Sequence, residues 1–223
     1  MKTNHEKLVR FLAVSLLLLS SVLMAIAPVT SAQARAKMDR QEFHDAMRKL
    51  WEDHITWTRL VIIGIFAGLP AADVEASTER LLQNQVDIGN AIKPFYGDEA
   101  GEQLTALLKD HILIAAEILQ AAKSGDTAAL EDAVERWYAN ADDIAEFLHA
   151  ANPKHWPLEE MKTMMREHLD LTLKEAVAYL EGDYEASIAA YDEVHLQALE
   201  MADMLSEGII KQFPKKFKGG GDD

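Results

Sequence analysis

The sequence contains no cysteine, and it is poor in proline and glycine, with 6 and 11 among its 223 residues. Without cysteine the chain forms no disulfide and no thiolate metal site, so its stability must come from packing. The scarcity of proline and glycine leaves long uninterrupted stretches in which apolar residues recur at the helical period. Alternating β-branched runs, which would indicate strands, are also missing. The sequence therefore predicts an all-α protein.

Basic side chains are few except at the N-terminus, where a basic segment precedes the apolar run Phe11–Val29. The small-residue triplet Ala32-Gln33-Ala34 follows, and this order is typical of a secretory signal peptide. We therefore expect residues 1–34 to be removed and the mature protein to be secreted or extracytoplasmic. An uncleaved N-terminal membrane anchor is the alternative, because the apolar run approaches the length of a membrane span.

The chain is acidic, with a net charge of −15. Removal of residues 1–34 takes away three basic residues and one acidic residue, so the charge of the mature chain becomes −17. This charge repels nucleic acids and anionic membrane surfaces, and it attracts cations or a cationic protein partner. A simpler interpretation is that the negative charge only keeps the protein soluble.

A repeat of 57 residues divides the mature chain. Gly68, Gly125 and Gly182 have this spacing, and so do three histidines, each preceded by an acidic residue. The pattern predicts three αα-hairpins in an up-and-down bundle of about six long helices. We expect one domain over residues 35–213, with repeats at about 40–97, 98–154 and 155–213, and a disordered tail at 214–223. The expected helices span residues 40–66, 71–93, 98–123, 126–150, 157–181 and 183–213. Closed bundle and open stack both remain possible.

The repeated histidine lies on the apolar face of the first helix of each hairpin. A buried imidazole without a hydrogen-bond partner would cost about 1–3 kcal/mol, so a partner must exist. The second helix of each hairpin offers an amide and an acid three residues apart. We expect the histidine to bond to one of them within its own hairpin. Burial would lower the histidine pKa, whereas a carboxylate partner would raise it. The residues concerned are His54 with Asn84 and Asp87, His111 with Asn140 and Asp143, and His168 with Gln197 and Glu200.

Two alternatives give these histidines a chemical role. In the first, they bind a divalent or transition metal ion such as zinc, copper, iron or manganese, provided that the bundle brings them together. The ligands would be His54, His111, His168, Asn84, Asp87, Asn140, Asp143 and Glu200. In the second, one His–Asp pair serves an acid–base enzyme. Threefold repetition of the same pair argues against catalysis, because active sites usually break repeat symmetry.

Methionine and arginine supply two weaker features. Soft thioethers with an imidazole could hold Cu(I), although methionine more often fills gaps in a core. The methionine set lies on the last two helices: Met161, Met164, Met165, Met201 and Met204, with His168. Arg59 occurs in the first repeat only. If it points inward it needs an acid such as Asp87 or Asp143, and otherwise it extends to the surface.

Several segments resemble a set of exported helical proteins of spore-forming bacteria to which no function is assigned. They are LWEDHITWTR (50–59), LLQNQVDIGNAIKPFYG (81–97), LLKDHILIAAEIL (107–119), WYANADDIAEFL (137–148) and EMADMLSEGIIKQF (200–213). The resemblance covers most of the mature chain and implies a secreted or surface-held helical bundle. It implies no catalytic residues. Our leading hypothesis is a non-enzymatic, extracytoplasmic binding or interaction protein.

Overall fold

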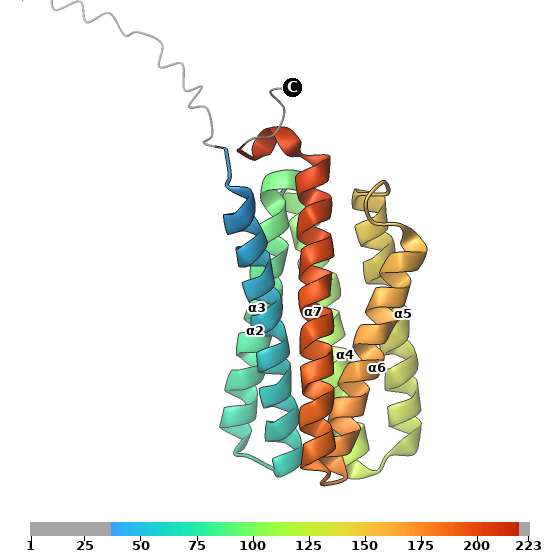
Figure 1. Ribbon diagram of the computed structural model, residues 1–223. Coiled ribbons are helices and arrows are strands. Elements are labelled where there is room, and N and C mark those ends of the chain that lie inside the picture. The colour runs from blue at the N-terminus through green and yellow to red at the C-terminus, as the bar shows by residue number, and fades with distance from the viewer. Residues whose placement is uncertain (1–36, 219–223) are drawn as a thin grey trace, which may run out of the picture. The chain divides into compact units, whose positions relative to one another are not determined.

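The computed structural model describes residues 37–218, which form an all-α bundle as the sequence predicts (Figure 1). The expected signal peptide, residues 1–34, lies outside the described residues. The helices agree with the expected spans to within three residues. They are α2 (Arg40–Ala67), α3 (Ala71–Tyr96), α4 (Asp98–Ser124), α5 (Thr127–Ala151), α6 (Leu158–Leu180) and α7 (Tyr184–Gln212), followed by the 3₁₀ turn η1 (Pro214–Lys216).

The hairpin turns repeat one local design. Gly68 and Gly125 adopt left-handed backbone conformations with φ of 69° and 72°, which glycine reaches without a steric penalty. An aspartate then begins the second helix of the second and third hairpins, where Asp126 and Asp183 accept hydrogen bonds from free backbone N–H groups. These end signals explain why the helix bounds could be predicted. Pro94 is the exception, because it lies inside the last turn of α3 and does not end that helix.

The six helices form a closed ring. Each helix packs against the next one in the chain, and α7 also packs along α2, which closes the ring (Figure 1). The first helices of the three hairpins, α2, α4 and α6, run in the same direction, and α2 also contacts α4 and α6. The question of closure, which the sequence leaves open, is therefore answered in favour of a closed bundle.

The prediction of a disordered tail at residues 214–223 is wrong for its first part. The side chain of Phe217 is completely buried and packs against Phe43 and Phe95, with ring centroids 5.4 and 5.6 Å apart. A backbone bridge joins Phe217 to Met38 at the other end of the described chain. Phe217 is a single aromatic residue in a polar segment, so helical periodicity in the sequence does not indicate that it is buried. Residues 219–223 lie outside the described part.

Helices α3 and α4 approach each other closely at two glycines. A Cβ atom added to Gly89 would lie 2.5 Å from the backbone oxygen of Gly101 and 2.0 Å from Oγ1 of Thr105. A side chain at this crossing would therefore force the two helices apart. Glycine is required here by backbone proximity.

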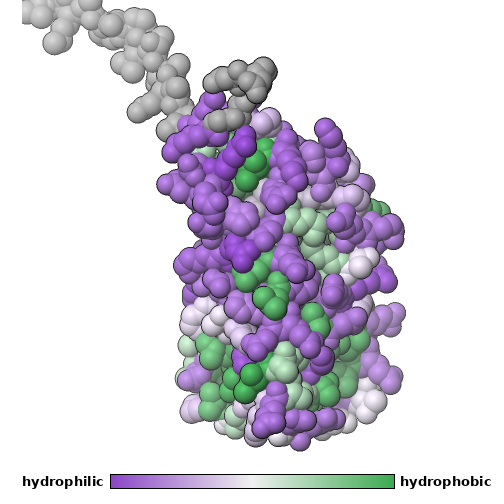
Figure 2. Space-filling model, viewed as in Figure 1, coloured by the Kyte–Doolittle hydropathy of each residue, from purple (hydrophilic) through white to green (hydrophobic). Residues whose placement is uncertain are grey.

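The outer face is mostly hydrophilic, as Figure 2 shows, with apolar side chains more frequent toward the end of the bundle that holds the α6–α7 turn. Val177, Leu180 and Tyr184 near this turn are exposed. None of the helices within residues 37–218 has the length and hydropathy to cross a membrane.

Candidate functional site

The three repeated histidines meet in the middle of the bundle. The ring centroid of His168 on α6 lies 5.8 Å from that of His54 on α2 and 6.4 Å from that of His111 on α4. Each of the three residues is only 3% exposed. Because the histidines occupy equal positions on three parallel helices of a closed ring, equal spacing in the sequence becomes convergence in space. We call these three residues the histidine centre.

In the second and third hairpins an amide of the second helix satisfies the histidine. Nδ1 of His111 donates to Oδ1 of Asn140 at 2.9 Å, and Nδ1 of His168 donates to Oε1 of Gln197 at 3.1 Å. The amide nitrogens donate in turn to the backbone oxygens of Leu107 and Met164, four residues before each histidine. One amide therefore fixes the register of two helices, which confirms the expected pairing in the second and third hairpins.

The first hairpin departs from this pattern. Asn84 donates to the backbone oxygen of Leu50 as its counterparts do, but Nδ1 of His54 accepts from Nε2 of Gln85 at 3.2 Å. Nε2 of Gln85 also donates to the backbone oxygen of Leu81 and to Oδ1 of Asn84, whereas His111 and His168 each have an amide oxygen as the partner and therefore carry a proton on Nδ1. The sequence reasoning missed Gln85. The signal was available, because the positions that correspond to Gln85 hold Ala141 and Ala198.

Burial keeps the histidine centre neutral. Desolvation, together with a smaller effect of the neighbouring imidazoles, lowers the pKa of His54 and of His111 to about 3. Desolvation lowers the pKa of His168 to about 4, against a weaker opposing effect of the hydrogen bond to Gln197. These groups are uncharged at neutral pH, so the centre behaves as a polar core and not as a cationic patch.

The acids proposed as ligands do not join the histidines. Asp87 lies near the surface, within 3.7 Å of the Arg80 guanidinium, and Asp143 and Glu200 are exposed. Each acid comes three residues after its amide, which places it at the edge of the helix face that the amide occupies, next to solvent. The placement of the acids beside the imidazoles is therefore wrong, and the imidazoles bond to amides alone. Within residues 37–218 no three His, Asp or Glu side chains are grouped so that they could hold a metal ion.

Arg59 points inward, but its partner is neither of the expected acids. Its guanidinium donates to Glu175 on α6 at 2.7 Å and lies over the ring of Tyr191. Glu175 is 1% exposed, and burial raises its pKa to about 7 although Arg59 opposes that rise. Asp87 and Asp143 do not serve because both lie near the outer surface of the bundle. The second repeat holds Ala116 and Ile118 at the positions of Arg59 and Glu175.

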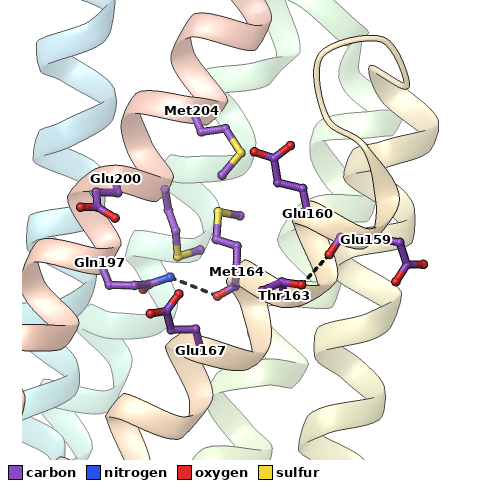
Figure 3. Close-up of a pocket in the computed structure, with 9 residues that line it drawn as sticks. Glu159, Glu160, Thr163, Met164, Glu167, Gln197, Glu200 and Met204 are labelled. Atoms are coloured by element: carbon purple, nitrogen blue, oxygen red, sulfur yellow. Dashed lines mark hydrogen bonds between the residues drawn. The ribbon is translucent and has the colours of Figure 1, made fainter.

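A cleft of about 480 Å³ lies between α6 and α7, and Gln197, the hydrogen-bond partner of His168, lines it (Figure 3). We call it the α6–α7 cleft. Thr163 and Gln197 are its uncharged polar residues, and Gln197 donates to the Met164 backbone oxygen there. The other lining residues are acidic or carry thioethers: Glu159, Glu160, Glu167, Glu200, Met164, Met201 and Met204.

All five methionines of the set singled out in the sequence belong to the main apolar core or pack against it, and three of them also line the α6–α7 cleft. Met161 and Met165 are buried in the main apolar core, at 0% and 2% exposure. Met164, Met201 and Met204 line the α6–α7 cleft, and Figure 3 shows the side chains of Met164 and Met204 extending into it from opposite helices. His168 does not line the cleft, but it bonds to Gln197, which does.

The four glutamates of the cleft have no ion-pair partner within 4.0 Å among residues 37–218. The nearest basic side chains on the same helix are engaged elsewhere: Lys162 pairs with Glu146, and Arg166 pairs with Asp142, both on α5. None of the described residues that line the cleft is basic. Lys162 and Arg166 still interact electrostatically with Glu159, so the negative charge of the cleft, which thioethers also line, is only partly compensated.

The first two repeats show what is unusual about the third. In the first repeat, Lys49 and Arg80 lie against Asp53 and Asp87, the counterparts of Glu167 and Glu200. In the second, Arg136 lines a hollow together with Asp110 and Asp143, although its ion-pair partners are Glu117 and Asp132. In the third, this arginine position is occupied by Glu193. The thioethers are also specific to the third repeat: the first two hold Leu50 and Leu107 in place of Met164, Ile88 and Ile144 in place of Met201, and Ala91 and Phe147 in place of Met204.

Comparison of the chain with protein-family models, with curated proteins and with solved structures gave no match. The resemblance to exported helical proteins therefore stays a prediction. What the molecule can do has to be argued from its own residues.

Proposed function

We propose that the protein is a non-enzymatic, extracytoplasmic binding protein that takes up a cationic ligand in the α6–α7 cleft. The observation that carries the proposal is the difference between the third repeat and the first. Where the first repeat neutralises its acids with Lys49 and Arg80, the third leaves Glu167 and Glu200 without a cation. Such an arrangement suits a site in which the ligand supplies the missing positive charge.

The size of the cleft agrees with this role. A volume of about 480 Å³ lies within the range of about 300–1,000 Å³ that small-molecule sites occupy. The cleft is built on two long helices whose register Gln197 fixes through His168 and the Met164 backbone. The rigid histidine centre then serves as the scaffold behind the cleft. Export, which rests on the N-terminal segment, would place the cleft in contact with external cations.

The proposal is tested with a simple polycation. Spermidine is titrated into the purified protein by isothermal calorimetry at low salt, and the same titration is made with the Glu167→Gln/Glu200→Gln variant. We expect binding by the protein, weakened by about tenfold or more in the variant, because two charges that face the ligand are lost.

The repeat supplies a matched control. Asp110→Asn/Asp143→Asn makes the same change in charge at the equivalent positions of the second hairpin, where Arg136 is present. Binding should stay within about twofold of the unchanged protein. Equal weakening by both variants would mean that the affinity reflects net charge alone, and it would overturn the assignment of the cleft.

A further inference from the structure

We propose that the α6–α7 cleft binds a soft monovalent metal cation, Cu(I), through the thioether sulfurs of Met164, Met201 and Met204. This inference rests on the proposed function and names its ligand. The sequence alone offered a larger set that included Met161, Met165 and His168. In the structure Met161, Met165 and His168 do not line the cleft, and His168 bonds to Gln197, which does.

The burial of the thioethers points to a ligand more directly than the acids do. Met164 and Met201 are 8% and 1% exposed, yet both line the cleft. Packing alone does not require sulfur here, because leucine and isoleucine hold these positions in the first two repeats. Three substitutions to methionine around one cleft replace apolar carbon with a polarisable donor atom. Thioethers are soft ligands that favour Cu(I) over magnesium, calcium or manganese.

The glutamates complete the case for a soft ion. Among the described residues the carboxylates are not grouped to chelate a metal ion by themselves, so the cleft lacks the oxygen cage that a hard divalent cation needs. The negative charge of Glu160, Glu167 and Glu200 instead attracts a monovalent cation toward neutral sulfur ligands. Figure 3 shows the carboxylate of Glu160 and the thioether of Met204 both extending into the cleft.

The absence of cysteine suits this chemistry. A thiolate site would be lost to disulfide formation in an oxidising compartment, whereas thioethers form no disulfide. The chain has no cysteine at all, so cysteine cannot contribute to copper binding. Binding as proposed involves no electron transfer, since the ion enters and leaves as Cu(I).

The test uses Ag(I), which has the charge and softness of Cu(I) without its redox chemistry, and then Cu(I) under anaerobic conditions against a chromophoric chelator. We expect one ion per chain. The variant Met164→Leu/Met201→Ile/Met204→Ala gives the third repeat the residues of the first and should weaken binding by about 100-fold or more. Met165 also lies on α6 but does not line the cleft, so Met165→Leu should leave the affinity for the ion within about twofold of the unchanged protein.

Methyl NMR locates the ion independently of affinity. With methionine labelled at its methyl carbon, Ag(I) should shift the signals of Met164, Met201 and Met204 and leave those of Met47 and Met165 in place. Binding of less than one ion per chain, or equal affinity of the triple variant, would overturn the copper site. If spermidine still binds through Glu167 and Glu200 in that case, the proposed function stands and the ligand is an organic cation. If spermidine also fails, both proposals fall.

Discussion

Gln197 joins His168 to the α6–α7 cleft through a single amide. Its Oε1 accepts from Nδ1 of His168 at 3.1 Å, its Nε2 donates to the Met164 backbone oxygen at 3.0 Å, and its side chain lines the cleft. The same residue thus satisfies the core and shapes the surface site. Anything that moves this amide should affect both.

Replacement of this amide should therefore destabilise the bundle. Gln197→Leu leaves the His168 Nδ1–H and the Met164 carbonyl buried without partners, and we expect a loss of about 2–5 kcal/mol in the free energy of unfolding. Gln197→Asn retains an amide, as the first two repeats do with Asn84 and Asn140, and should lose less. Urea denaturation followed by circular dichroism measures both. A leucine variant within about 0.5 kcal/mol of the unchanged protein would contradict this role.

Stability should fall as the solution is acidified from pH 6.5 to 5. In the folded protein the pKa of His54 and His111 is about 3 and that of His168 about 4, against 6.5 as the ordinary value. Below pH 6.5 the three histidines therefore bind protons in the unfolded chain but not in the folded chain. The loss is about 2 kcal/mol per histidine at pH 5, or roughly 6 kcal/mol for three. Glu175, with a folded pKa of about 7 against an ordinary 4.5, binds a proton in the folded protein over the same range and offsets about 2 kcal/mol, so we expect a net loss of roughly 4 kcal/mol.

Urea denaturation at pH 7.5, 6.5 and 5 measures this loss. Carboxylates whose folded pKa is lowered by a partner, such as Asp142 beside Arg166, lose their contribution only as the pH falls toward 4 and below. The two effects therefore occupy different ranges of pH. Unchanged stability between pH 7.5 and 5 would show that the imidazoles are not held neutral by burial.

A methyl group at the crossing of α3 and α4 should be poorly tolerated. Gly89→Ala places its Cβ against Thr105 and the Gly101 backbone, so the helices must separate, and we expect a loss of about 1–3 kcal/mol. Gly97→Ala is a useful comparison, because there only the backbone conformation, with φ of 90°, is strained and the surrounding space is open. Thermal denaturation of both variants separates crowding from backbone strain. A stabilised Gly89→Ala protein would mean that the helix crossing is loose.

Replacement of Arg59 alone should destabilise the protein strongly, whereas replacement of both Arg59 and Glu175 should cost little stability. Arg59→Ala leaves a carboxylate that is 1% exposed without its cation, and we expect a loss of about 3–5 kcal/mol. Arg59→Ala/Glu175→Ile copies the second repeat, with Ala116 and Ile118, and should recover most of that loss. Urea denaturation at pH 7.5 compares the single and double variants. A double variant as unstable as the single one would show that the pair contributes more than mutual neutralisation.

The sequence was sufficient to predict the helices, because a helical period and αL glycines are local properties that need no knowledge of the partner. It was also sufficient for the pairing of His111 and His168, since a buried donor must be satisfied and each second helix offers few suitable groups. The sequence could not predict closure of the ring, because the contact of α2 with α7 joins the two ends of the described chain. Any prediction that the three histidines would meet depended on that closure.

The α6–α7 cleft could not be predicted from the sequence, for a different reason. Methionine, leucine and isoleucine give the same apolar pattern, so periodicity cannot show that Met164 faces a cleft while Met165 faces the core. Comparison of the three repeats would have marked the methionines as a departure, as it would have marked Gln85. The partner of Arg59 could not be predicted either, since Glu175 comes from a helix that is distant in the sequence.

The bridge between Met38 and Phe217 brings the beginning and the end of the described bundle together. In a ring of three hairpins with neighbouring ends, no hairpin is the first one in space; the order of the hairpins is a matter of where the backbone happens to be interrupted. A circularly permuted protein, cut at Gly125 and joined across Met38 and Phe217, should build the same architecture. Triplication of one hairpin would then have produced a ring-shaped molecule in which one hairpin could acquire a binding site while the other two maintained the fold.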